Sequence, residues 1–184
     1  MVAIPQSFAR LAQEIDGWLD LRCPEKALAR LGAMLEDPAA RPAALVFRVR
    51  ALVNMTQYAT ALGDLAELRG SDHDPEWLDL TEAWCRKRSD DLPGAVRCME
   101  QLVARNQRSA IGHFNLGCYL ALAGDKQRAL DEVTMACGLD VDLRDFAGDE
   151  PDLDSLHDDP RFRALLTGVD ADETRRPPDD AAPA

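Results

Sequence analysis

Alanine recurs every 34 residues along most of this chain. Each of these alanines is followed directly by Leu or Val, and further apolar residues lie four and seven places on. Spacings of four and then three place side chains on one stripe of a helix. A fixed period of this length is typical of helix–turn–helix units that stack, because one unit alone cannot bury its stripe. The recurring alanines are Ala27, Ala61, Ala95 and Ala129.

A second set of positions lies 12 residues before each alanine and holds Ile15, Val49, Ala83 and Gly117. We expect the two helices of each unit to cross at these two sets of positions, where a small residue lets the backbones approach. Turn signals occur in phase with the period. Asp74-Pro75 has the form of a helix start, Ser109 is a cap residue before another helix, and Gly124-Asp125 suits a tight turn.

The last unit is the most regular, and it resembles a tetratricopeptide-repeat (TPR) unit. The residues that carry this resemblance are Asn115-Leu116-Gly117, Leu120, Gly124-Asp125, Ala129, Val133, Ala136 and Leu139-Asp140. The resemblance covers residues 8–143. It implies an all-α fold, a right-handed α-solenoid of four helix–turn–helix TPR units plus a C-terminal capping helix. The units span 8–41, 42–75, 76–109 and 110–143, after an N-terminal lead-in at 1–7.

Two segments depart from the family pattern. The first unit has Arg22-Cys23-Pro24 where a Gly turn is usual. The third unit has Asp79, Glu82 and Arg86 at positions that the resemblance expects to be apolar, and its apolar residues fall instead at Trp77, Leu80, Ala83 and Trp84. We therefore expect the first helix of the third unit to be rotated, or shifted in register by one residue.

After the fourth unit, residues 144–168 are similar to the closing segment of bacterial TPR groups. Asp159-Pro160 predicts a helix start, and Phe162, Leu165 and Leu166 share one face of that helix. We expect this segment to cap the apolar end of the last unit, since terminal elements of repeat proteins do so. The alternative is a motif that docks elsewhere. The composition of residues 169–184 predicts a disordered tail.

Composition excludes several classes of function. The net charge is −12, with residues 140–184 contributing −9, so a nucleic-acid partner is not expected. No apolar run is long enough for a membrane span. The N-terminus lacks the features of a signal peptide, and five irregularly spaced cysteines indicate reduced thiols, so we expect a cytoplasmic protein. The abundance of arginine over lysine hints at a bacterial source.

No pattern in the sequence predicts chemistry. The three histidines, His73, His113 and His157, have no His or Cys partner at metal-ligand spacing. Nucleophile, phosphate-loop and dinucleotide motifs are absent from the sequence. We therefore expect neither an enzyme, nor a metal, nor a cofactor.

The resemblance implies that the first helix of each unit lines a concave groove. Phe47 is an extra aromatic on the polar side of its helix and suggests a contact point, although packing on a neighbouring helix is an equal alternative. Trp84 belongs either to the groove or, as the burial typical of Trp favours, to the core. The amides of Asn54 and Asn115 suit a peptide backbone. The predicted peptide-binding groove comprises Phe47, Arg50, Asn54, Trp77, Thr81, Trp84, Arg88, Phe114, Asn115 and Cys118.

The function expected from these features is non-catalytic protein–protein interaction, as a scaffold that binds a peptide or helix of another protein. The basic and Asn clamp with which some TPR proteins hold chaperone C-termini has no counterpart here. Two alternatives stay open. One is a chaperone of a bacterial secretion system, and the other is a structural protein that self-associates into a homo-oligomer.

Overall fold

A computed structural model describes residues 4–71 and 73–168. All regular structure in these ranges is helical, which confirms the predicted all-α class. The contacts between Cα atoms divide the chain into two compact parts, residues 1–98 and 99–184, which we call the N-terminal part and the C-terminal part. The predicted disordered tail at 169–184 lies outside the described residues.

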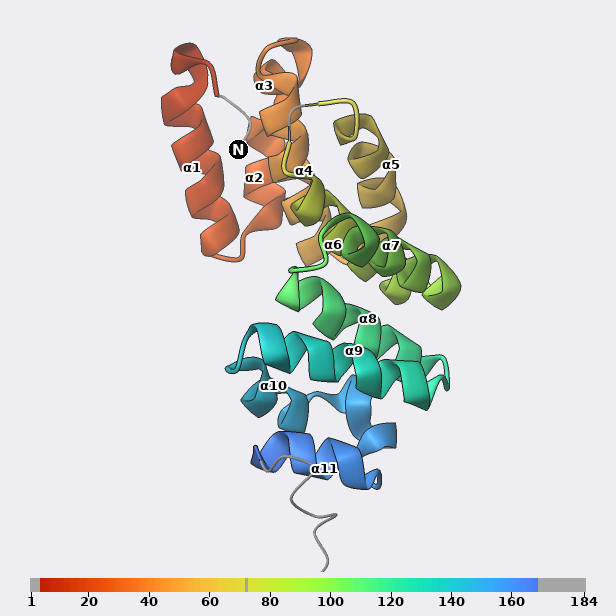
Figure 1. Ribbon diagram of the computed structural model, residues 1–184. Coiled ribbons are helices and arrows are strands. Elements are labelled where there is room, and N and C mark those ends of the chain that lie inside the picture. Colours follow the sequence, from red (N-terminus) through yellow and green to blue (C-terminus); the bar gives the residue numbers. More distant parts are fainter. Residues whose placement is uncertain (1–3, 72, 169–184) are drawn as a thin grey trace, which may run out of the picture. The chain divides into compact units, whose positions relative to one another are not determined.

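In the N-terminal part, α1 packs on α2, α2 and α3 pack on α4, α4 packs on α5, and α5 packs on α6 (Figure 1). The second helix of the first predicted unit is divided into α2 and α3 at Leu31. The boundary between the two parts falls within the residues of α7. The elements are η1 (Gln6–Phe8), α1 (Ala9–Asp20), α2 (Pro24–Arg30), α3 (Gly32–Glu36), α4 (Arg41–Asn54), α5 (Tyr58–Leu68), α6 (Pro75–Arg88) and α7 (Leu92–Arg105).

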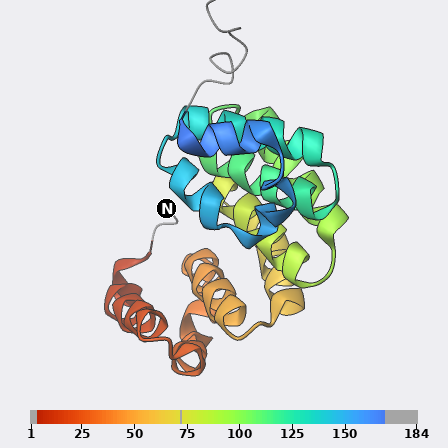
Figure 2. The same cartoon turned by 90° about the horizontal axis from the view of Figure 1, so that it is seen from below.

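The C-terminal part is built around the pair α8 and α9, which lie side by side in both views (Figures 1 and 2). The segment η2 packs on both of them, and α10 and α11 pack on α9 and on each other. Phe162, Leu153 and Leu156 of this closing segment are buried. The elements are α8 (Ala110–Leu122), α9 (Lys126–Leu139), α10 (Leu143–Asp149), η2 (Pro151–Leu156) and α11 (Pro160–Thr167).

The recurring alanines lie at buried sites. All four have a relative exposure of 0%, as do Ile15, Val49 and Ala83 at the second set of positions. At Gly117, an added Cβ would lie 2.5 Å from Cγ2 of Val133 and 3.1 Å from the carbonyl oxygen of Ala129. A contact that short cannot be accommodated, so α8 and α9 require glycine where they meet.

The turn between the two helices of each unit has the same backbone form four times. Arg22, Thr56, Asp90 and Gly124, spaced 34 residues apart, all have positive φ, at 55°, 57°, 60° and 86°. The residue after each donates its N–H at 2.9 Å to the carbonyl five residues earlier, as in Cys23 to Trp18 and Asp125 to Leu120. This is the Schellman arrangement that closes a helix through a left-handed residue. The first unit therefore keeps the common turn without glycine.

The expected rotation of the third unit's first helix is wrong. In α6, Asp79 is 2% exposed and Ala83 is fully buried, so the helix keeps the register of the other units. The carboxylates of Asp79 and Glu82 can occupy packed positions because arginine side chains form ion pairs with them there. Arg69 donates to Asp79 at 2.9 Å and to Glu82 at 3.0 Å, and Arg86 donates to Glu82 at 2.9 Å.

We expect Arg69→Met to lower the free energy of unfolding by about 2 kcal/mol, because it removes the cation that faces a buried carboxylate. The matched control is Arg30→Met, which breaks an exposed pair with Glu14 (3.0 Å) and should cost less than about 1 kcal/mol. Urea denaturation measures both changes. Equal losses for the two variants would show that the Arg69 network does not stabilise the fold.

Arg69→Met should also change how the free energy of unfolding depends on pH. Burial raises the pKa of Glu82, but hydrogen bonds from Arg69 and Arg86 outweigh it, so the pKa is lowered overall. A lowered pKa contributes stability that is present above the unfolded-state value and is lost as pH falls through the folded-state value. The gap in stability between wild type and Arg69→Met should therefore narrow below about pH 4.

Candidate functional site

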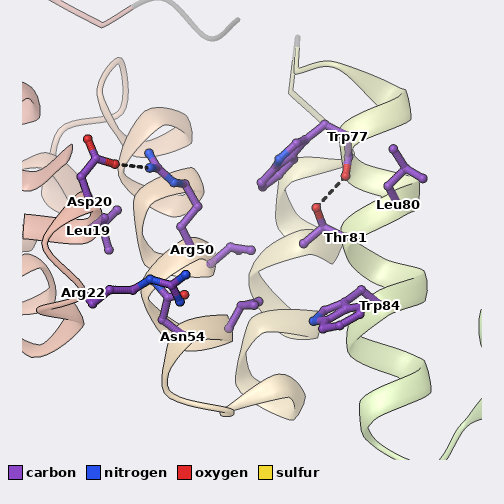
Figure 3. A pocket seen from close by; sticks show the side chains of 11 residues that line it. Leu19, Asp20, Arg22, Arg50, Asn54, Trp77, Leu80, Thr81 and Trp84 are labelled. Carbon is purple, nitrogen blue, oxygen red and sulfur yellow. Dashed lines mark hydrogen bonds and ion pairs between the residues drawn. The ribbon is translucent and has the colours of Figure 1, made fainter. Parts of the chain in front are cut away.

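A pocket of about 630 Å³ opens on the N-terminal part between α1, α4 and α6 (Figure 3). These are the first helices of three successive units, so the repeat itself brings the walls together. The α1–α2 turn completes the rim. The lining residues are Leu19, Asp20, Arg22, Val49, Arg50, Val53, Asn54, Trp77, Leu80, Thr81 and Trp84.

Two indoles form the α6 wall. Trp77 and Trp84 are two helical turns apart, and both rings point toward α4 (Figure 3). Between them, the hydroxyl of Thr81 donates to the carbonyl of Trp77 at 2.7 Å. The expectation that Trp84 belongs to the core is wrong, because its side chain is 41% exposed. The wall therefore offers aromatic surface that the described chain does not cover.

Basic and imidazole side chains hold the two indoles. The guanidinium carbon of Arg88 lies 5.1 Å from the ring centroid of Trp84, and the ammonium of Lys87 lies 5.9 Å from it. The ring of His73 meets Trp77 edge-on at 4.7 Å. Burial lowers the pKa of His73, and both of its ring nitrogens are buried without a hydrogen-bond partner in the described chain. His73 therefore packs on Trp77 as a neutral ring at neutral pH.

The opposite wall carries a cation that is already paired. Arg50 of α4 donates to Asp16 of α1 at 2.5 Å, and it lies 3.7 Å from Asp20 (Figure 3). Asn54 follows one helical turn later and is exposed. Arg50 was predicted as a groove residue, but its positive charge is already shared by two carboxylates of α1.

Five of the ten predicted groove residues line this pocket: Arg50, Asn54, Trp77, Thr81 and Trp84. Arg88 lies at its edge through the contact with Trp84. Phe47 is 8% exposed and packs in a core cluster with Ile15 and Leu19, so the packing alternative describes it.

The other predicted residues belong to α8 in the C-terminal part. Phe114 and Cys118 are 6% and 3% exposed, so their side chains are core rather than surface. Asn115 is half-buried and donates to the carbonyl of Ile111 on its own helix at 2.9 Å. Arg22, by contrast, lines the pocket and was not predicted, because the expected groove was restricted to helical positions.

The described residues bring together no group of three metal-ligating side chains. Within the same ranges, no helix has both the length and the apolar character needed to cross a bilayer. The lining of the pocket combines aromatic, aliphatic, amide, guanidinium and carboxylate groups.

Comparison with known proteins supports the fold. No protein-family model and no curated protein matches the chain significantly. A solved structure titled "MamA RS-1 ArsTM double mutant" is similar, with a TM-score of 0.66 over 93% of this chain and 98% of that chain, at 16% sequence identity. MamA is a TPR-containing protein. The likeness shows that the fold is TPR-like and all-helical.

Proposed function

We propose that this protein is a non-catalytic interaction module of the TPR type that binds a peptide or helix of a partner protein in the pocket between α1, α4 and α6. The observation that carries the proposal is the open α6 wall, with Trp77 and Trp84 on one face and Trp84 41% exposed. Aromatic side chains combine a large apolar surface with few rotatable bonds, and they are enriched at the centres of protein interfaces.

The rest of the lining suits an extended or helical segment better than a small metabolite. Val53 of α4 and Leu80 of α6 add half-buried apolar side chains to the lining. Asn54 supplies an amide that can both donate to and accept from a peptide backbone. A cleft with three helices as walls gives a ligand several points of contact along its length.

Two further features belong to the same proposal. The five cysteines are free thiols, and four of them are buried, which favours a reducing cytoplasm. The resemblance of 144–168 to the closing segment of bacterial TPR groups favours a bacterial protein. A secretion-type chaperone fits this setting, and a self-associating scaffold is the alternative use of the same surface.

The test is affinity capture from the native cell with Asn54→Ala/Trp84→Ala as the pocket variant. Both residues are exposed, so the double change should alter the melting temperature little while it abolishes capture of the partner. The matched control is Asn115→Ala/Phe146→Ala, which removes an amide and a 65% exposed aromatic from the C-terminal part. Capture should survive in the control.

Two results would redirect the proposal. If the pocket variant captures the partner as well as wild type does, the partner uses another face. If light scattering during size-exclusion chromatography shows a stable oligomer that only the pocket variant disrupts, the pocket serves self-association.

A further inference from the structure

Three of the four left-handed turn residues are not glycine. Arg22, Thr56 and Asp90 have φ between 55° and 60°, a region that L-residues with a Cβ seldom adopt. Within the N-terminal part, Arg22 lines the pocket between α1, α4 and α6, whereas Thr56 and Asp90 are not among its lining residues. A strained residue at a binding cleft is a reason to look for a role of its side chain.

The charge of Arg22 is not compensated within the chain as described. No carboxylate among residues 4–71 and 73–168 pairs with its guanidinium, although Asp20 also lines the pocket and Glu25 lines a smaller adjoining hollow with it. Asp20 is turned toward Arg50 instead (Figure 3). Arg22 therefore places a guanidinium without a carboxylate partner in the described ranges at the rim of the pocket.

Arg22 is also placed to act together with the rest of the lining. It shares both the main pocket and the smaller hollow with Asn54. Trp84 also lines the main pocket. Its ring is in contact with the guanidinium of Arg88, a second cation without a carboxylate partner in the described ranges. An occupant that lies on the indoles therefore has a guanidinium and an amide at one end of the cleft.

We propose that Arg22 is a specificity-determining residue that binds an acidic side chain, Asp or Glu, of a partner peptide whose apolar side chain lies on Trp77 and Trp84. The inference rests on the proposed function and names the chemistry of its ligand. A guanidinium can hold a carboxylate through two parallel hydrogen bonds, which gives direction as well as attraction. Arg50 is not available to bind this carboxylate, because its guanidinium is already paired with Asp16 and Asp20.

A cation just beyond the last turn of α1 also suits the dipole of that helix, which is a purely structural reason for its presence. Lysine at the same place would serve the dipole equally well. It would not provide the planar fork that matches a carboxylate. Arg22→Lys therefore separates the two roles.

The experiment selects peptides from a random phage-displayed library on the full wild-type chain. The selected sequences should carry Asp or Glu within a few residues of Phe, Leu or Trp. Their dissociation constants, measured by fluorescence anisotropy on synthetic copies, should rise about five- to tenfold with Arg22→Gly, as expected for loss of one charge-assisted contact at a partly exposed site. Arg22→Lys should weaken binding to a smaller extent, and added salt should weaken binding to wild type.

Melting temperature supplies the control for folding. Arg22→Gly relieves the strained backbone, so it should melt at a slightly higher temperature than wild type while it binds more weakly. Thr56→Gly relieves the equivalent turn of the next unit away from the pocket lining, and it should melt higher with unchanged binding. Opposite effects on folding and binding cannot come from damage to the fold.

Each result decides between the two proposals. Selected peptides that lose binding to Asn54→Ala/Trp84→Ala but lack acidic residues, or that bind Arg22→Gly as tightly as wild type, would overturn the role of Arg22 and leave the pocket standing. Peptides that bind the pocket variant undiminished, or the failure to select any peptide, would overturn the pocket as a peptide site and the role of Arg22 with it.

Discussion

Ala61→Arg is expected to cost roughly 3 kcal/mol or more of folding free energy, or to prevent folding altogether. Ala61 of α5 is fully buried in a core cluster with Val49, Leu52 and Leu65, where α4 and α5 pack together. A guanidinium at this site has to overfill a close-packed helix crossing and lose its hydration at the same time. Urea denaturation followed by circular dichroism measures the loss.

The matched control lies on the same helix. Ala59 is exposed, and Ala59→Arg makes the same chemical change two residues away, so its effect should stay within about 0.5 kcal/mol of wild type. If Ala61→Arg melts within a degree or two of wild type, the 34-residue phase does not mark the helix crossings.

The helix crossings could be predicted from the sequence because each crossing requires a small residue at a fixed position. Only a small residue lets two helices approach closely, so the recurrence of alanine and the glycine at 117 report a geometric requirement directly. The turns are less visible. Arg22 adopts the same left-handed backbone as Gly124, because the helices on both sides and the hydrogen bond from Cys23 to Trp18 impose it.

The predicted rotation or register shift of α6 is wrong because hydrophobic periodicity describes each helix without its neighbours. Asp79 and Glu82 look misplaced in a helix whose buried face should be apolar. Their partner, Arg69, follows α5, and the pairing depends on how α5 and α6 pack. A pattern that scores hydrophobicity along one element contains no information about a cation supplied by the next one.

The sequence predicted only part of the candidate site, again because some of its contacts depend on a neighbouring helix. The family pattern names helical positions that tend to face the groove, and this was enough to find Trp77 and Trp84. It could not show that Phe47 packs in a core cluster with residues of the first unit, nor that Asp16 accepts a hydrogen bond from Arg50, because both depend on the side chains of the neighbouring unit. Arg22 was missed because a turn residue is outside that set of positions.

The second large effect is expected on removal of the closing segment. A chain that ends at Asp142 loses α10, η2 and α11, which pack on α9 and, through η2, on α8. Three large apolar side chains of this segment, Leu153, Leu156 and Phe162, are at most 1% exposed. Burial of a large aliphatic or aromatic side chain contributes about 1.5–3 kcal/mol, so the deletion should cost about 4 kcal/mol or more.

The comparison chain ends at Gly168 and keeps the whole described segment. It should retain the helical circular dichroism and the melting temperature of the full protein, whereas the chain ending at Asp142 should melt well below it. Hydrogen exchange should locate the loss in α8 and α9, since Val133 and Ala136 of α9 are fully buried in the complete chain. Phe162→Ala in the full chain should reproduce most of the effect, at about 3–5 kcal/mol. If the two truncated chains melt together, residues 144–168 do not cap the last unit, and the alternative that this segment docks on a partner becomes the better explanation of its apolar side chains.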